Sequence, residues 1–144
     1  MTETGNKKPG KMPADSAEAI AIAQKEIFEK FGTSFLELKD GSAVATVRIL
    51  PENRNFYGIP YGGFLFNLAD NTAGMAFLSA GGNGITVSGS VNYYRGADPE
   101  TESLICRARV VKRGRNLFFV NADVEDPSGR LLSSYNFIVT NLKG

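Results

Sequence analysis

One carboxylate stands alone inside an apolar segment of the chain. Asp70 is the only charged residue of GIPYGGFLFNLADNTAGMAFLSAGG, which runs from residue 58 to residue 82. Burying an ionised carboxylate without partners costs several kcal/mol, or its pKa rises until the group is neutral. Two roles are therefore open for Asp70: membership of a local network with Asn67, Asn71 or a neighbouring strand, or service as a base or nucleophile at a cleft.

The composition removes several kinds of active site. The chain contains no histidine, which excludes a Ser-His-Asp triad, a Cys-His pair, a dehydratase site that depends on histidine and any metal site that needs imidazole. Cys106, the single cysteine, alternates with Arg107 and Arg109 in LICRARV, so we expect it in the core. We expect no metal and no cofactor, and an acid is the natural candidate for catalysis.

Size and charge set the class of protein. The chain has 144 residues, 42% of them hydrophobic, and its net charge of +1 gives no overall attraction to nucleic acid or to an anionic membrane. Residues 1–14 are polar and lack the apolar core of a signal peptide, and no apolar run approaches the ~20 residues of a membrane span. We expect a soluble, cytoplasmic protein with a disordered arm over residues 1–14 and a single domain over residues 15–144.

Two helices are predicted, one near the start of the chain and one within the apolar segment. Asp15 with Glu18 resembles a capping pair, and the apolar residues that follow recur at three- and four-residue steps, which predicts an amphipathic helix over residues 16–31. A second helix is predicted from Gly62 to Ala80. Because it is apolar on most sides, we expect it to be buried.

Period-two alternation predicts strands in the rest of the chain. Residues 35–50 predict a hairpin about the turn Lys39-Asp40-Gly41, and residues 51–60 predict a loop because they are rich in Asn, Pro and Gly. Four more strands are predicted, over residues 85–94, 102–112, 116–125 and 131–141. The short turns imply antiparallel neighbours. The expected fold is α+β, an antiparallel sheet wrapped around one long central helix.

The segment that contains Asp70 resembles a known family. Residues 55–63, NFYGIPYGG, followed by LAD at residues 68–70, are similar to the N-x-x-G-x-x-H-G-G-x-x-x-x-L-x-D signature of hotdog-fold acyl-CoA thioesterases of the phenylacetic-acid-degradation (PaaI-like) type. Residues 86–97 are similar to the T-x-x-x-x-x-N-F-x-R-P-A strand of that family, and the likeness continues through Gly114-Arg115. It covers about residues 35–141 and implies a hotdog fold.

Two positions depart from this pattern. Gly96 stands where the family usually has proline, which changes a turn, and Tyr61 stands where it usually has histidine. A phenol donates and accepts hydrogen bonds, but its pKa near 10 makes it a poor base at neutral pH. Tyr61 therefore bears on the rate or the substrate range that the resemblance implies.

The resemblance implies a site for thioester hydrolysis. The N–H of Gly63, or alternatively of Gly62, would polarise the thioester carbonyl at the start of the second helix, where no side chain blocks the approach. A tight turn into the helix is the structural alternative for these glycines. Asp70 would act as the nucleophile or as the general base that activates water, and the sequence does not separate these two routes.

Other side chains would complete the site. Asn55 would orient the water or the thioester, with a loop-stabilising role as the alternative, and Thr86, or less favourably Ser88, would place the water. An ordinary strand residue is the alternative for Thr86. The acyl group would lie in an apolar channel whose candidate residues are Phe64, Phe66 and Met75.

The implied partners are the substrate and a second copy of the chain. The CoA phosphates would meet the basic turn that contains Lys112, Arg113 and Arg115, or else Arg95, although turns are often charged simply for solubility. In relatives with this motif, the aspartate and the Asn/Gly-Gly elements of one site come from different subunits. This implies a homodimer joined sheet edge to sheet edge, or a homotetramer built as a dimer of dimers.

Three functions remain for comparison. The leading one is hydrolysis of acyl-CoA thioesters without metal or cofactor. The second is a hotdog protein that binds an acyl thioester without turning it over or serves as an assembly scaffold, which Tyr61 keeps open. The third, a hotdog hydratase, is less favoured because that branch generally relies on histidine.

Overall fold

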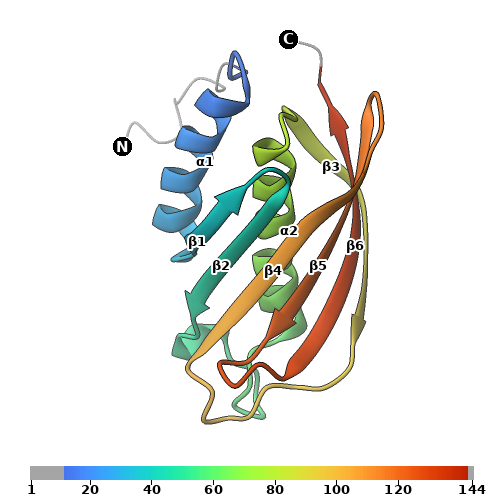
Figure 1. Cartoon of the computed structure of the whole chain (residues 1–144). Helices are drawn as coiled ribbons and strands as arrows, with labels where there is room; N and C mark the ends of the chain where they lie inside the picture. The colour runs from blue at the N-terminus through green and yellow to red at the C-terminus, as the bar shows by residue number, and fades with distance from the viewer. Residues whose placement is uncertain (1–11, 143–144) are drawn as a thin grey trace.

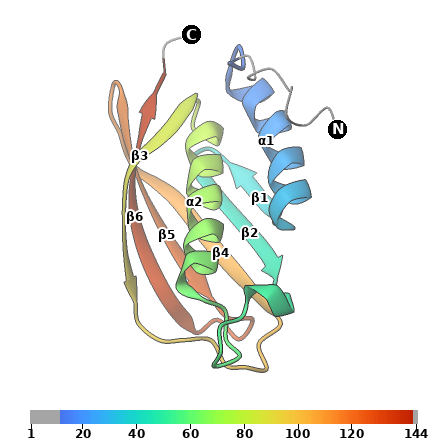
Figure 2. The same cartoon turned by 180° about the vertical axis from the view of Figure 1, so that it is seen from behind.

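The computed structural model describes residues 12–142 and is built on a six-stranded antiparallel sheet in the order β1-β2-β4-β5-β6-β3. The strands are β1 (Ser34–Lys39), β2 (Ser42–Arg48), β3 (Gly84–Tyr93), β4 (Ser103–Arg113), β5 (Leu117–Glu125) and β6 (Leu131–Asn141). The helices are α1 (Ser16–Phe31) and α2 (Gly62–Ser79). The sheet curves around α2, and α1 lies beside α2 and β1 (Figures 1 and 2). The expected α+β hotdog architecture is confirmed.

The first helix begins at the predicted cap. The Glu18 N–H donates to Asp15 Oδ1 at 2.9 Å, and Glu18 Oε2 in turn accepts from the Ala14 N–H at 2.7 Å. One N–H of the first helical turn, that of Glu18, and the N–H of Ala14 just before the N-cap are thereby satisfied. Of the arm predicted over residues 1–14, residues 1–11 lie outside the described residues. The Pro13 carbonyl accepts a hydrogen bond from the side chain of Asn83 at 2.9 Å.

The predicted hairpin is formed by β1 and β2, which pair in register from Lys39↔Ser42. Asp40 and Gly41 take φ values of 46° and 90°, and two consecutive positive φ values fit the tight turns that match the twist of paired strands. Within the segment predicted as a loop, a short 3-10 helix, η2 (Pro51–Asn53), precedes the irregular chain that leads into α2.

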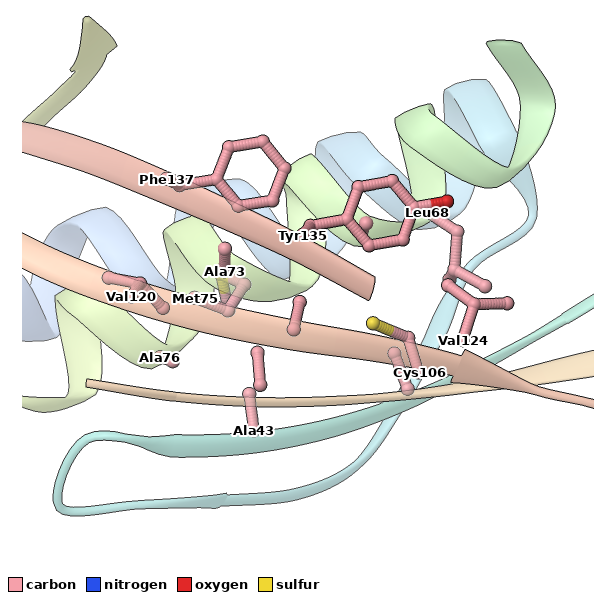
Figure 3. Close-up of a cluster of buried hydrophobic side chains, with 14 of the residues drawn as sticks. Ala43, Leu68, Ala73, Met75, Ala76, Cys106, Val120, Val124, Tyr135 and Phe137 are labelled. Atoms are coloured by element: carbon pink, nitrogen blue, oxygen red, sulfur yellow. The ribbon is translucent and has the colours of Figure 1, made fainter. Parts of the chain in front are cut away.

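The core lies between α2 and the sheet. Figure 3 shows Leu68, Met75 and Ala76 of α2 against side chains of the central strands, among them Val120 and Phe137. Small side chains on both surfaces, such as Ala43 and Ala73, let the helix approach the strands closely. Met75 is 1% exposed, so it belongs to the core and not to the channel in which it was expected.

Cys106 is buried in this core, as predicted. Burial raises the pKa of its thiol to about 12. A thiol that keeps its proton is a poor nucleophile, so Cys106 is structural.

The two edges of the sheet differ. β1 is an edge strand of six residues, whereas β3, the other edge, has ten. Within the described residues β3 pairs only with β6, and it exposes the apolar side chains of Ile85 and Val87. A long apolar edge strand of this kind is a template for pairing with another strand.

No helix within residues 12–142 combines the length and the apolar character needed to cross a lipid bilayer.

Candidate active site

Asp70 lies near the middle of α2, and its side chain reaches strand β3 of the sheet. The side chain is half-buried, and Thr86 Oγ1 on β3 donates a hydrogen bond to Asp70 Oδ1 at 2.9 Å. The side chains of Asn67 and Asn71 bond to each other at 3.2 Å and not to Asp70. Of the neighbours expected for Asp70, the adjacent strand therefore supplies its hydrogen-bond partner. The structure therefore brings together two of the predicted site residues, Asp70 and Thr86.

The environment of Asp70 makes it a stronger base than an ordinary aspartate. Burial raises the pKa of its carboxyl, and the hydrogen bond from Thr86 acts in the opposite direction because it stabilises the charged form. No cluster of potential metal ligands occurs in the part of the chain that the structure describes.

Ser88, the alternative to Thr86, faces away from Asp70. In a regular strand, residues two apart share a face, but a bulge between Thr86 and Ser88 shifts the register. Thr86 is opposite the buried Val139, whereas Ser88 is opposite Ile138 and is exposed. The bulge thus leaves Thr86, which was favoured over Ser88, as the strand residue that bonds to Asp70.

The start of α2 carries two free amides. Tyr61 is the N-cap residue, with φ −76° and ψ 158°, and its side chain makes no capping hydrogen bond. Within residues 12–142, neither the Gly62 nor the Gly63 N–H has an acceptor, and the Phe64 N–H is the first in the turn to be satisfied, by the Tyr61 carbonyl at 3.0 Å. A helix start with free N–H groups is a site for a negatively charged oxygen.

Asn55 stabilises its own loop and also faces a hollow. Its Oδ1 accepts from the Tyr57 N–H at 2.9 Å and the Ile59 N–H at 3.4 Å, which is the loop-stabilising role that the sequence left open. Its side-chain nitrogen makes no hydrogen bond in the described part of the chain. Asn55 also lines a hollow of about 300 Å³ with Gly62 and Arg95, so one donor of Asn55 is available there.

Arg54, which the sequence analysis did not single out, holds this loop in place. Its Nη1 donates to the carbonyls of Gly58 at 2.8 Å and Pro99 at 3.1 Å, and its Nη2 donates to the Thr101 carbonyl at 2.8 Å. The guanidinium thus ties the loop before α2 to the segment after β3. The only sequence signal was an arginine next to Asn55, which by itself is uninformative.

The predicted CoA-binding arginines divide into two groups. Arg95 lies at the hollow beside Asn55, near the start of α2. Arg113 and Arg115 lie at the β4–β5 hairpin, which Figures 1 and 2 show at the opposite end of the molecule from the loop that enters α2. The Arg113 guanidinium lies 6.0 Å from the ring centroid of Phe118. Of these three arginines, Arg95 is the one that lies near the first amides of α2 in the same chain.

A groove of mixed character adjoins the free amides on the side of α1. It has a volume of about 590 Å³. Its lining includes Gly63 and the aromatic side chains of Phe28, Phe31, Tyr61 and Phe64, together with polar and charged side chains, namely Glu29, Lys30, Glu52, Asn53 and Asn67. Among the three expected channel residues, Phe64 alone lines this groove.

Phe66, the remaining channel candidate, points elsewhere. Its ring packs edge-on against the rings of Tyr135 and Phe137, with centroid distances of 5.7 and 5.5 Å. Like Met75, it supports the core.

One chain does not bring Asp70 and Gly63 onto the same substrate atom. Asp70 follows Gly63 by seven residues on α2, which at a rise of 1.5 Å per residue separates them by about 10 Å along the axis. A carbonyl that accepts from one group and is attacked by the other needs both within about 3–3.5 Å. The two predicted parts of the site, Asp70 and the Gly63 N–H, therefore lie apart along α2 in one chain.

Comparison with known proteins finds a matching family and several relatives. The Thioesterase superfamily model matches residues 57–133. A putative esterase of Archaeoglobus fulgidus is 27% identical over 108 residues, covering 75% of this chain and 70% of that protein. Human acyl-coenzyme A thioesterase 13 is 28% identical over 96 residues, covering 65% of this chain and 68% of the relative.

A solved structure extends the comparison to the site. A hypothetical thioesterase of Streptococcus pneumoniae with coenzyme A superposes with a TM-score of 0.74 at 25% identity, covering 85% of this chain and 93% of that one. Structures also exist of two variants of that protein, in which an aspartate and a threonine were each replaced by alanine. Those two positions are 16 residues apart, the same separation as Asp70 and Thr86.

Proposed function

Because the chain belongs to the thioesterase superfamily, we propose that it hydrolyses acyl-CoA thioesters to the free acid and CoA. The observation that carries this proposal is the half-buried Asp70 carboxylate, which accepts a hydrogen bond from Thr86 of β3. The acyl-CoA substrate is supported by the human relative and by the coenzyme A in the pneumococcal structure. The matching aspartate–threonine separation in that protein supports the two residue roles.

The reaction adds water across the carbon–sulfur bond. The carbonyl oxygen gains negative charge as its carbon is attacked, and the free Gly63 N–H, with Gly62 as the alternative, stabilises that charge. The carbon–sulfur bond then breaks, and the sulfur leaves as CoA thiol after taking up a proton. The free nitrogen of Asn55 orients the thioester or the water from the neighbouring hollow.

Asp70 has two routes to the same products. As a general base it removes a proton from water while the oxygen of that water attacks the thioester carbon. As a nucleophile it forms a mixed anhydride and expels the thiolate, and water then cleaves the anhydride. Thr86 holds the carboxylate in both routes.

We assign the complete site to two subunits, because the backbone positions of Asp70 and Gly63 in one chain are separated by about 10 Å along the axis of α2. The free edge of β3 is the surface on which a second copy would pair, and its exposed Ile85 and Val87 favour that contact. In an antiparallel β3–β3 pair, the Thr86 end of one strand lies beside the Tyr93 end of the other. Asp70 would then face the partner's Gly63, so a homodimer is the smallest active unit, and two dimers can form a homotetramer.

In the proposed β3–β3 dimer, the acyl group and the CoA phosphates would each have a binding region. The acyl group enters the groove beside Gly63, whose aromatic lining suits an apolar chain or ring. Arg95 lies near the amides of its own chain, and the partner's Arg113 and Arg115 approach the same end through the pairing of β3. These cations suit the phosphates of CoA.

Thiol release from a panel of acyl-CoAs tests the proposed function. The wild type should release CoA, and Asp70→Asn should lower kcat by at least 100-fold, as expected for loss of a general base. Asp123→Asn is the matched control, because Asp123 also accepts a hydroxyl hydrogen bond, from Ser134 at 2.6 Å, but on the exposed outer surface of the sheet. It should retain wild-type activity.

The alternatives predict different results. A protein that binds without turnover would show acyl-CoA binding in calorimetry and no thiol release from any substrate. A hydratase would instead add water to the double bond of an enoyl-CoA and leave the thioester intact. Either result, or full activity in Asp70→Asn, would refute thioester hydrolysis at this site.

A further inference from the structure

Tyr93 reaches the start of α2 with the hydroxyl end of its side chain. Its hydroxyl donates to the Gly62 carbonyl at 2.9 Å across 31 positions of sequence. Its ring packs edge-on against Tyr135, with the two planes at 90° and the centroids 6.3 Å apart. The ring therefore packs on the sheet, and its hydroxyl end lies against the start of α2.

Gly62 leaves the room that this contact needs. A Cβ at Gly62 would lie 3.1 Å from Cζ and 3.2 Å from the hydroxyl oxygen of Tyr93. A side chain there would push the phenol away from the carbonyl. The glycine and the tyrosine thus fit each other.

The Gly62 carbonyl and the Gly63 N–H belong to one planar peptide group. Donation to the carbonyl oxygen of a peptide draws electron density from its nitrogen and makes its N–H a stronger donor. That N–H is free of any acceptor within residues 12–142. The Tyr93 hydroxyl and a substrate oxygen would therefore occupy opposite ends of the same peptide.

We propose that Tyr93 is a positioning residue for thioester hydrolysis: its hydroxyl fixes the plane of the Gly62–Gly63 peptide and strengthens the Gly63 N–H as the donor to the developing oxyanion. The proposal rests on the proposed function, since it assumes that this amide meets the thioester carbonyl. Burial raises the pKa of Tyr93, which keeps its hydroxyl protonated and able to donate at neutral pH.

Tyr93→Phe tests the proposal because it removes one oxygen and keeps the ring. One neutral hydrogen bond is worth about 0.5–1.5 kcal/mol, so we expect kcat to fall roughly three- to tenfold. KM should stay within twofold of wild type, because the donor acts on charge that develops after binding. Tyr94→Phe is the control, since the Tyr94 hydroxyl is exposed and makes no hydrogen bond in the described part of the chain.

Two further measurements separate polarisation from packing. The amide nitrogen of a peptide senses hydrogen bonding at the carbonyl of the same peptide, so the Gly63 ¹⁵N resonance should shift in Tyr93→Phe and not in Tyr94→Phe. If Tyr93→Phe does not fold, Gly62→Ala keeps the hydroxyl but displaces it, and the same loss in kcat is expected.

Each outcome bears on one claim. A wild type that hydrolyses no acyl-CoA would refute the proposed function, and with it any catalytic role of Tyr93, before a variant is made. An active wild type with Tyr93→Phe equal to Tyr94→Phe in kcat would refute the role of Tyr93 alone. A rise in KM without a fall in kcat, or an unshifted Gly63 resonance, would also refute it.

Discussion

A mixture of two inactive variants should regain activity if each site uses two chains. The first variant, Asp70→Asn, removes the carboxylate. The second, Gly63→Pro, removes the N–H, because proline has none, and proline is tolerated in the first turn of a helix. Gly63→Ala is the matched control, since it adds a Cβ at 3.4 Å from the Tyr61 ring but keeps the N–H.

The size of the recovery follows from the geometry. In a mixed dimer, one site combines the two altered residues, and the other combines the intact Asp70 of one chain with the intact Gly63 of its partner. Random pairing makes half of the dimers mixed, and half of their sites are intact. The mixture should therefore reach about a quarter of the wild-type rate per chain, which follows from the twofold symmetry of such an interface.

The assay uses co-expression of the two variants with different affinity tags. Sequential capture on both tags isolates mixed dimers, whose expected rate is about half that of wild type because one site in two is intact. Each variant purified alone gives the background, and Gly63→Ala mixed with Asp70→Asn reports any effect of the added methyl group. Mixed dimers that stay at the background rate would refute the two-chain site.

Four further outcomes are expected. Thr86→Val removes the hydrogen bond that lowers the Asp70 pKa, so the pKa should rise. Because activity needs the ionised carboxylate, kcat/KM should begin to fall at a higher pH as the solution is made acidic, and an unmoved acid limb of the kcat/KM profile would contradict this. Asp70→Asn should raise the melting temperature at pH 7 by a few degrees, because burial disfavours the ionised carboxylate in the folded state, and the gain should vanish in acid as the aspartate protonates. Tyr61→Asp should stabilise the fold by about 1 kcal/mol as an N-cap, measured by urea denaturation, and should suppress hydrolysis because its carboxylate would occupy the first-turn amides. Arg95→Gln should raise KM for acyl-CoA but not for acyl-pantetheine, which has no nucleotide phosphates.

Local signals predicted the elements well. The helix over residues 16–31 has the predicted bounds because its cap at Asp15 and its apolar spacing lie within the segment itself. The strands after α2 begin and end within one residue of the predictions, since alternation and turn residues are also local. Candidate site residues in α2 could be proposed because a charge and a pair of glycines stand out in an apolar segment.

Contacts between distant segments were not predictable in the same way. The pairing of β3 with β6 and not with β4 depends on the whole sheet, and it decides that β3 is a free edge. Arg54 and Tyr93 act through backbone carbonyls, which every residue has, so no residue type marks the partner. The bulge between Thr86 and Ser88 also has no recognisable signal in the sequence.

The two helices of this chain begin in different ways, and the difference explains where the site lies. The Asp15 carboxylate accepts a hydrogen bond from the Glu18 N–H of α1, a helix on the outside of the fold. Tyr61 makes no such bond, and the N–H groups of Gly62 and Gly63 have no acceptor within residues 12–142. Omitting a cap costs about 1 kcal/mol. The helix α2 tolerates that cost because it is stabilised by the core that it forms with the sheet. A buried helix can therefore keep its first amides for a ligand. In the proposed dimer these amides would face the Asp70 carboxylate of the second copy, which would pair along the edge of β3 that has no partner within residues 12–142.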